Sequence, residues 1–107
     1  MILVTTSEIA GKHIVRTLGL VRGNTIRARH VGKDIMAILR NVAGGEIHEY
    51  TKMLAEAREQ AIDRLVEDAE ALGANAVVGM RFQTSMIQTG AAEMLCYGTG
   101  VVVEADD

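Results

Sequence analysis

Apolar and polar positions follow two periods along the chain, a short one in several stretches and a helical one in the middle. MILVTT (1–6) and HIVRTLGLV (13–21) are apolar and rich in β-branched residues, which predicts a strand in each. RGN (22–24) has the composition of a tight turn, so TIRAR (25–29) is expected to be the return strand of a hairpin.

A helical period dominates the middle of the chain. In residues 34–42, apolar residues recur at helical spacing after Asp34, a candidate N-cap, and this pattern predicts a short helix. Residues 46–73 predict a long amphipathic helix that ends at Gly73. One stripe of this helix carries Leu54, Ala57, Arg58, Ala61, Leu65, Ala69 and Leu72. The opposite face carries Glu56, Glu59, Asp63, Glu67 and Glu70, a pattern typical of a solvated surface.

The C-terminal part returns to strand patterns. Residues 75–87 and 91–104 are apolar stretches that flank a loop at 88–90, which predicts a hairpin. Strands, then helices, then strands indicate an α+β domain. The expected fold is a small antiparallel sheet covered by one long amphipathic helix plus a short helix, in a single domain of residues 1–107.

The last strand has no polar face. Its odd-numbered and even-numbered positions are both mainly apolar, so both faces of the sheet require cover. In the preceding strand, Val78, Met80 and Phe82 are expected to share one face. One helix covers one face only, and the simplest partner for the other is a second copy of the chain. Gly98 and Gly100 are expected to allow close approach of that copy.

Composition narrows the class of protein. The 107 residues are 49% apolar and include one Cys, no Trp, two Tyr and one Phe. A single Cys forms no internal disulfide, which favours a reducing compartment. No basic n-region precedes an apolar segment, and no apolar run reaches the ~20 residues of a membrane-spanning helix. We therefore expect a soluble, cytoplasmic protein.

The net charge is −3, but basic residues gather in the first 44 positions and acidic residues in the remainder. A basic half can indicate a nucleic-acid surface. Here that half contains no aromatic residue on which bases would stack, so nucleic acid is not expected as a partner. The two halves are expected to pack on each other, or on neighbouring copies, with matched charges.

Candidate chemistry is sparse. Cys96, His13, His30 and His48 are too far apart in sequence for the close-spaced pairs of a structural zinc site. Cys96 is interpreted as a small buried apolar residue, and EIHE (46–49) as an exposed helix start. Arg22 and residues 27–33 could hold an anion, but their glycine spacing matches no phosphate loop. No catalytic residue is assigned, and the cofactor-binding and metal-binding residues remain unknown.

The most specific segments are Gly44–Gly45, Ala57–Arg58 and residues 73–79, within GGEIHEYTKMLAEAREQAIDRLVEDAEALGANAVVGMRFQTS (44–85), followed by YGTGVVVE (97–104). Through these segments the whole chain resembles the YbjQ-like family, whose small proteins are also labelled putative heavy-metal-binding. The resemblance implies a dodecin-subunit-like fold and a ring-shaped homopentamer, in a family of bacterial and archaeal proteins. Dodecins bind flavin between aromatic rings, for which three aromatic residues give little support.

Three functional hypotheses follow. The first is a ring-forming homo-oligomeric binding or scaffolding protein without catalytic activity. Its partner is a further copy of itself, and its small-molecule ligand is unknown. Neither nucleic acid nor a membrane is expected as a partner. The alternative is a heavy-metal-binding protein with sites repeated around a homopentamer, to which Cys96 or His48 contributes. The third is an enzyme that acts on a small anion near residues 22–33.

Overall fold

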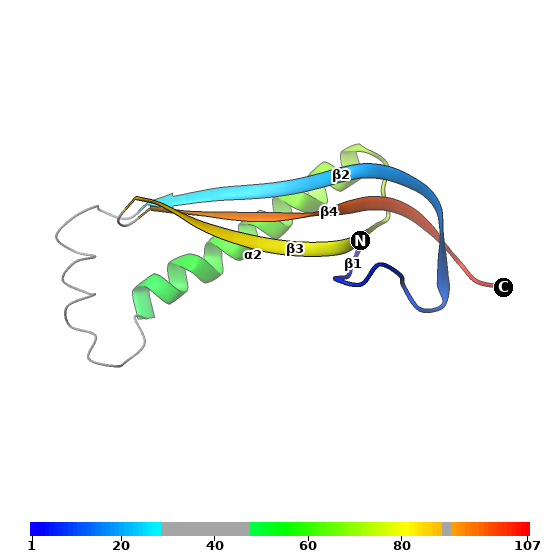
Figure 1. The fold of residues 1–107 in the computed structure, drawn as a ribbon, viewed down its shortest axis with the longest axis horizontal. Helices are drawn as coiled ribbons and strands as arrows, with labels where there is room; N and C mark the ends of the chain where they lie inside the picture. Colours follow the sequence, from blue (N-terminus) through cyan, green and yellow to red (C-terminus); the bar gives the residue numbers. More distant parts are fainter. Residues whose placement is uncertain (29–47, 89–90) are drawn as a thin grey trace.

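The protein is a four-stranded sheet with one long helix across it, in a computed structural model that describes residues 1–28, 48–88 and 91–107 (Figure 1). The elements are β1 (Ile2–Leu3), β2 (Lys12–Ala28), α2 (His48–Ala71), β3 (Ala76–Gln88) and β4 (Ala91–Ala105). The strand order is β1-β3-β4-β2. The α+β class is confirmed, but the sheet is mixed, because β1 runs parallel to β3.

β2 corrects the predicted N-terminal hairpin. The chain does not turn at residues 22–24, and β2 pairs with β4 from Lys12 to Ala28 as one strand with two irregularities. The reason is the position of Gly23, which lies directly beneath α2: a β-carbon there would lie 2.2 Å from the backbone oxygen of Ala61. Glycine is present at this position because the helix backbone approaches closely, and the same glycine resembles a turn residue in sequence.

The long helix and the C-terminal hairpin agree with the prediction. α2 spans His48–Ala71, and Gly73 follows it with a φ of 89°. The helix end is closed by the N–H of Ala74, which donates to the carbonyl of Ala69 at 3.0 Å. The predicted short helix 34–42 lies outside the described residues. None of the helical residues described here forms a stretch that is both long and apolar enough to cross a membrane.

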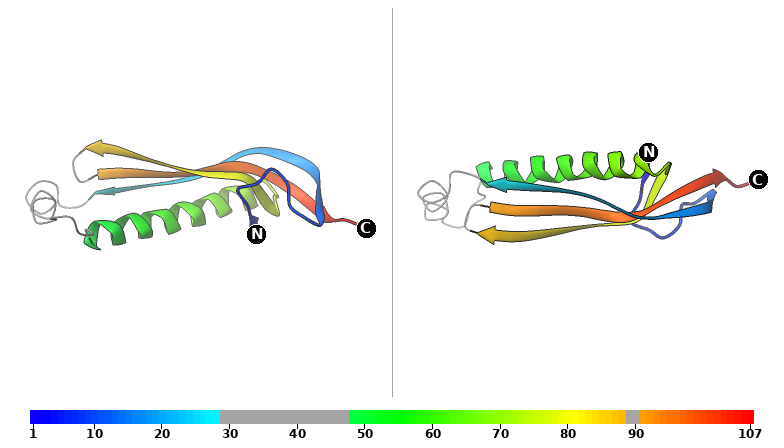
Figure 2. Two further views of the ribbon diagram at one scale, coloured as in Figure 1. Left: turned by 60° about the horizontal axis from the view of Figure 1, so that its bottom comes forward. Right: turned by 90° about the horizontal axis from the view of Figure 1, so that it is seen from above.

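The two faces of the sheet are covered by different parts of the chain. α2 runs along one face, over β2 and β4 and away from β3 (Figure 2). The core on this helix side comprises Val21, Ala57, Ala61, Leu65, Ala69, Ala74, Val77, Met94 and Cys96. The N-terminal segment contributes Ile2, Val4 and Ile9 to a second cluster, with Ala76, Val78, Val101 and Val103. Each face is therefore covered along only part of its length.

A bulge in β3 changes which residues share a face. The register shifts between Val78 and Arg81, next to Gly79, whose φ is 62°. Phe82 consequently stands opposite Cys96 on the helix side, whereas Val78 packs in the second cluster. The expectation that Val78 and Phe82 lie on one face was wrong, because strict alternation does not survive an inserted residue.

Gly98 and Gly100 lie on the inner face, not on a docking face. A β-carbon at Gly98 would lie 2.7 Å from Cγ1 of Val77, and one at Gly100 would lie 3.1 Å from Cγ1 of Val21. These glycines make room for core side chains of the same subunit. Their expected role in contact with another copy is therefore wrong.

Candidate functional site: a buried thiol and an uncovered sheet face

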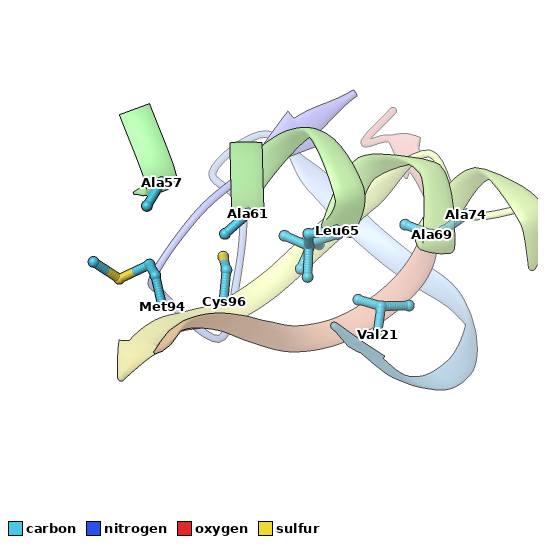
Figure 3. Close-up of a cluster of buried hydrophobic side chains, with 9 residues drawn as sticks. Val21, Ala57, Ala61, Leu65, Ala69, Ala74, Met94 and Cys96 are labelled. Carbon is cyan, nitrogen blue, oxygen red and sulfur yellow. The ribbon is translucent and has the colours of Figure 1, made fainter. Parts of the chain in front are cut away.

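Cys96 is a packing residue between the sheet and the helix. Its side chain is completely buried, and its sulfur points from β4 toward Ala61 of α2, beside Met94 (Figure 3). Burial raises the pKa of the Cys96 thiol above its ordinary value, because the charged thiolate loses its hydration there. Nucleophiles and metal ligands act as thiolates. The prediction of a buried apolar cysteine is confirmed.

Small residues bring α2 close to β2. Ala57 and Ala61 face the sheet, and the hydroxyl of Thr25 donates to the carbonyl oxygen of Ala57 at 3.0 Å. Thr25 is the one buried polar residue in the described part of the chain, and this bond satisfies its hydroxyl. The bond crosses from strand to helix, so it fixes the position of the helix along β2.

Charged side chains of α2 cover the outer edge of β2. The N–H of Arg22 donates to Oδ2 of Asp68 at 2.9 Å, and Nη1 of Arg64 donates to the carbonyl oxygen of Asn24 at 2.6 Å. The side chain of Arg27 donates to Oε1 of Gln60 at 2.8 Å. Asp68 and Arg64 therefore occupy backbone groups of β2 with which another strand could pair.

The proposed anion-binding stretch is only partly within the structure. Arg27 is turned toward the helix, where Nη1 also lies 3.9 Å from Oε2 of Glu56. Arg22 is exposed, and residues 29–33 lie outside the described residues. The described part of the stretch contacts α2 and does not converge on an anion site.

The sheet face opposite α2 carries an uncovered apolar surface. We define the uncovered face as Leu20 and Ile26 of β2 with Leu95 and Tyr97 of β4. Leu20 is 66% exposed and Ile26 is 60% exposed. Leu95 and Tyr97 are half-buried between them. Exposed apolar residues that gather on one surface are typical of interaction sites.

Polar groups border the uncovered face. Asn24 stands between Leu20 and Ile26 in sequence, and its Nδ2 lies 3.5 Å from Oε2 of Glu93 on β4. Leu20 and Ile26 were not predicted as a pair, because the expected hairpin placed them on two different strands. The signal in the sequence was that the two residues are an even number of positions apart. This spacing puts both side chains on one face only if the strand is continuous.

His13 lies at the far end of β2 from these residues. Its Nδ1 is 2.9 Å from Oδ1 of Asp106, and both side chains are about half exposed. A surface hollow of about 780 Å³ adjoins them, lined mainly by residues 6–14 with Val103 and Asp106. An acidic partner can orient a histidine toward a ligand, but this pair alone supplies one imidazole and one carboxylate.

The described histidine and cysteine residues, the possible metal ligands, lie apart from one another. Among the side chains that the structure describes, no three from His, Cys, Asp or Glu lie close enough together to hold a metal ion. Cys96 is sealed beneath α2, and His13 is at the opposite end of β2 from residues 20–26. His48 starts α2, and His30 lies outside the described residues. The described side chains of one subunit do not fit a heavy-metal site.

Relatives of similar length occur in archaea and bacteria. The chain is 63% identical over 103 residues to a UPF0145 protein of Methanosarcina acetivorans, which covers 96% of this chain and 97% of that protein. It is 58% identical over 107 residues to a UPF0145 protein of Clostridioides difficile, covering 100% of this chain and 96% of the relative. A UPF0145 protein of Pyrococcus abyssi is 55% identical over 107 residues, with 100% and 94% covered.

A solved structure supports the fold. A protein of unknown function from Pediococcus pentosaceus, described as a member of the DUF74 family, superposes with a TM-score of 0.62. The match covers 97% of this chain and 98% of that one, at 16% sequence identity. The family model described as "Putative heavy-metal-binding" matches residues 1–104, and the chain therefore belongs to this YbjQ family.

Proposed function

We propose that this chain is the subunit of a cytoplasmic, ring-shaped homo-oligomer that binds or scaffolds other molecules and does not catalyse a reaction. The ring number of five comes from the family resemblance. The observation that carries the proposal is the uncovered face, which leaves Leu20 and Ile26 mostly exposed beside Leu95 and Tyr97. A second copy would remove these side chains from water, at roughly 25 cal/mol for each Å² of apolar surface.

The shape of the subunit supports the same proposal. Its radius of gyration is 17.4 Å, and its principal extents are 58 × 25 × 15 Å. A compact domain of this length would have a radius of gyration of about 13 Å. A long, flat subunit exposes more surface for its volume than a compact one, and contact with neighbouring copies reduces this exposure.

The charge distribution fits contacts between unlike surfaces. Arg22 of β2 lies on the uncovered face between Leu20 and Ile26, whereas α2 exposes an acidic stripe toward solvent. Contact between two different surfaces of neighbouring copies is heterologous, and a heterologous contact closes into a ring when its rotation allows. A ring then repeats any ligand-binding surface once in each subunit.

The test compares two substitutions of exposed leucines. Leu20→Gln places a polar group on the uncovered face, and Leu72→Gln is the matched control at the end of α2, where the side chain is 45% exposed. Native mass spectrometry of the purified protein should show a ring for the wild type and the control, and smaller species for Leu20→Gln. The same spectra would show any small molecule that the ring carries.

Two outcomes contradict the proposal. A wild-type protein that remains monomeric at micromolar concentration would refute assembly altogether. An unchanged ring in Leu20→Gln, with circular dichroism equal to that of the control, would show that the uncovered face is not the contact.

A further inference from the structure

Among the residues that the structure describes, none pairs with the outer edge of β3 along half of the strand. The backbone of β1 and the residues after it bonds to the backbone of β3 only as far as Met80, whose N–H donates to the carbonyl oxygen of Val4 at 3.0 Å. One side-chain bond follows, from Nη1 of Arg81 to the carbonyl oxygen of Thr5 at 2.8 Å. Within residues 1–28, 48–88 and 91–107, no strand pairs with β3 beyond this point on the side away from β4. All side chains from Arg81 to Met86 are exposed.

The two outer edges of the sheet differ. The edge of β2 is occupied at Arg22 and Asn24 by side chains of α2. Along residues 82–86, the edge of β3 carries no charged side chain and no proline, the usual devices against strand pairing. An open, uncharged edge is a template for another strand, so β3 is the edge suited to a partner.

The register determines which backbone groups of β3 point outward. The N–H of Arg22 and the carbonyl of Asn24 face away from β4, so Gly23 between them bonds toward β4, opposite Cys96. Because alternate residues of a strand bond to opposite sides, Leu95 and Tyr97 bond toward β3.

The same alternation carries over to β3. Arg81 and Gln83 stand opposite Tyr97 and Leu95, so their N–H and C=O groups are used within the subunit. The N–H and C=O groups of the even-numbered residues Phe82, Thr84 and Met86 then point outward. An edge strand that offers three successive outward pairs of groups can accept a strand of equal length.

We propose that this edge pairs antiparallel with the same edge of a second copy, across a two-fold axis at Thr84. The pairing would set Thr84 opposite itself and Phe82 opposite Met86 of the other copy. It would also set Gln83 opposite Ser85. Apolar residues therefore meet apolar residues, and polar residues meet polar ones, with no charged side chain among residues 82–86.

The side chains at this contact support self-pairing. Phe82 is 39% exposed and Met86 is 68% exposed, and both lie on the helix side of the sheet, where α2 does not reach β3. A sulfur beside an aromatic ring is a favourable cross-strand pair. The two-fold axis repeats the contact between Phe82 of one copy and Met86 of the other, so all four side chains would be covered.

This inference rests on the proposal that the chain assembles with itself, but it uses a different surface. A cyclic ring built through the uncovered face has no two-fold axis across its subunits, so edge pairing joins rings in pairs. The assembly would then contain an even number of subunits, twice the number in one ring.

A cross-linking experiment tests the register. Directly opposed residues that share hydrogen bonds have α-carbons about 5.5 Å apart, within reach of a disulfide. Thr84→Cys should therefore form a disulfide-linked dimer under mild oxidation, seen on a non-reducing gel. Gln83→Cys is the matched control, because its diagonal counterpart lies about 7–8 Å away, beyond that reach. Native Cys96 is buried and serves as the background in both variants.

A second pair of variants tests the assembly itself. Thr84→Pro removes an outward N–H and keeps the backbone bonds between β3 and β4, and should halve the mass of the assembly. Its loss of the side-chain bond from Oγ1 of Thr84 to Sδ of Met94, 3.3 Å long, is shared by Thr84→Val, which therefore controls for it. Thr84→Val keeps that N–H and should leave the mass unchanged. Thr84→Lys is a second disruptive variant, for use if Thr84→Pro fails to fold. It places like charges opposite each other and should also halve the mass of the assembly.

The possible results separate the two proposals. An odd-numbered wild-type ring, or equal cross-linking of Thr84→Cys and Gln83→Cys, would overturn edge pairing and leave the ring proposal standing. A monomeric wild type would overturn both. An unchanged mass in Thr84→Lys would also overturn edge pairing.

Discussion

Substitution of Gly23 by alanine tests how closely α2 is seated on β2. The added β-carbon would lie 2.2 Å from the carbonyl oxygen of Ala61 and 2.3 Å from the nitrogen of Leu65. Both atoms belong to the helix backbone and cannot rotate away. Since ordinary contact begins at 3.4 Å, the helix would have to move outward by about 1.2 Å, the difference between 3.4 and 2.2 Å.

This displacement has a substantial energetic consequence. A gap of about 1 Å removes up to about half of the dispersion energy between the atoms that face each other. Overpacked cores lose about 1–3 kcal/mol, and this helix contributes much of the larger core cluster. We expect Gly23→Ala to lower the free energy of unfolding by about 3 kcal/mol, a large part of the ~5–15 kcal/mol of a typical domain.

Gly100→Ala is the matched control. Its β-carbon would meet Cγ1 of Val21 at 3.1 Å, and this atom belongs to a side chain that can rotate. The β-carbon of Ala74 would lie at 3.5 Å, which is ordinary contact. The expected loss is about 1 kcal/mol or less. Urea unfolding followed by circular dichroism measures both variants at one protein concentration. Equal midpoints for Gly23→Ala and Gly100→Ala would refute the close seating of α2 on Gly23.

Two further predictions concern the thiol and metal ions. Burial raises the pKa of Cys96 in the folded state, so its contribution to stability is complete below the ordinary pKa of 9.0 and is lost as pH rises above it. Cys96→Ala should weaken the fall in urea midpoint between about pH 8 and 10, and an identical fall in both proteins would contradict the burial argument. Treatment with EDTA should leave the native mass unchanged, since the described side chains bring no three metal ligands together. Dissociation on chelation, reversed by added zinc, would instead indicate a metal held between subunits.

The long helix and the C-terminal hairpin could be predicted from the sequence because their local signals agree with their tertiary roles. Ala57, Ala61, Leu65 and Ala69 recur at helical spacing, and the same residues form the buried stripe. Cys96 was predicted to be buried for a similar reason, since its neighbours in the strand are apolar. In these segments the pattern along the chain and the packing in space carry the same information.

The failures occurred where a glycine serves a tertiary contact. Gly23 has the sequence context of a turn, but the helix above it requires the missing side chain. Gly98 and Gly100 were assigned to a docking face, and they instead make room for core residues. Local sequence cannot distinguish these roles, because a glycine in a turn and a glycine beneath a helix have the same composition around them.

The candidate surfaces were hidden for a related reason. Leu20 and Ile26 share a face only because β2 continues through residues 22–24. The open edge of β3 depends on the strand order β1-β3-β4-β2, which is a property of the whole sheet. The sequence predicted that the apolar strands need a partner. The position of the partner could be inferred only from the register of the strands in the sheet.

The distribution of residue sizes links folding to assembly. The buried stripe of α2 is mostly alanine, whereas Leu20, Ile26, Phe82 and Met86 are exposed. Alanine buries little area, so close approach of the helix gives tight packing but a small hydrophobic contribution. If copies of the chain cover the larger side chains, part of the stability of each subunit comes from its neighbours, and that part depends on protein concentration. The unfolding comparison of Gly23→Ala with Gly100→Ala is therefore meaningful only at a fixed subunit concentration.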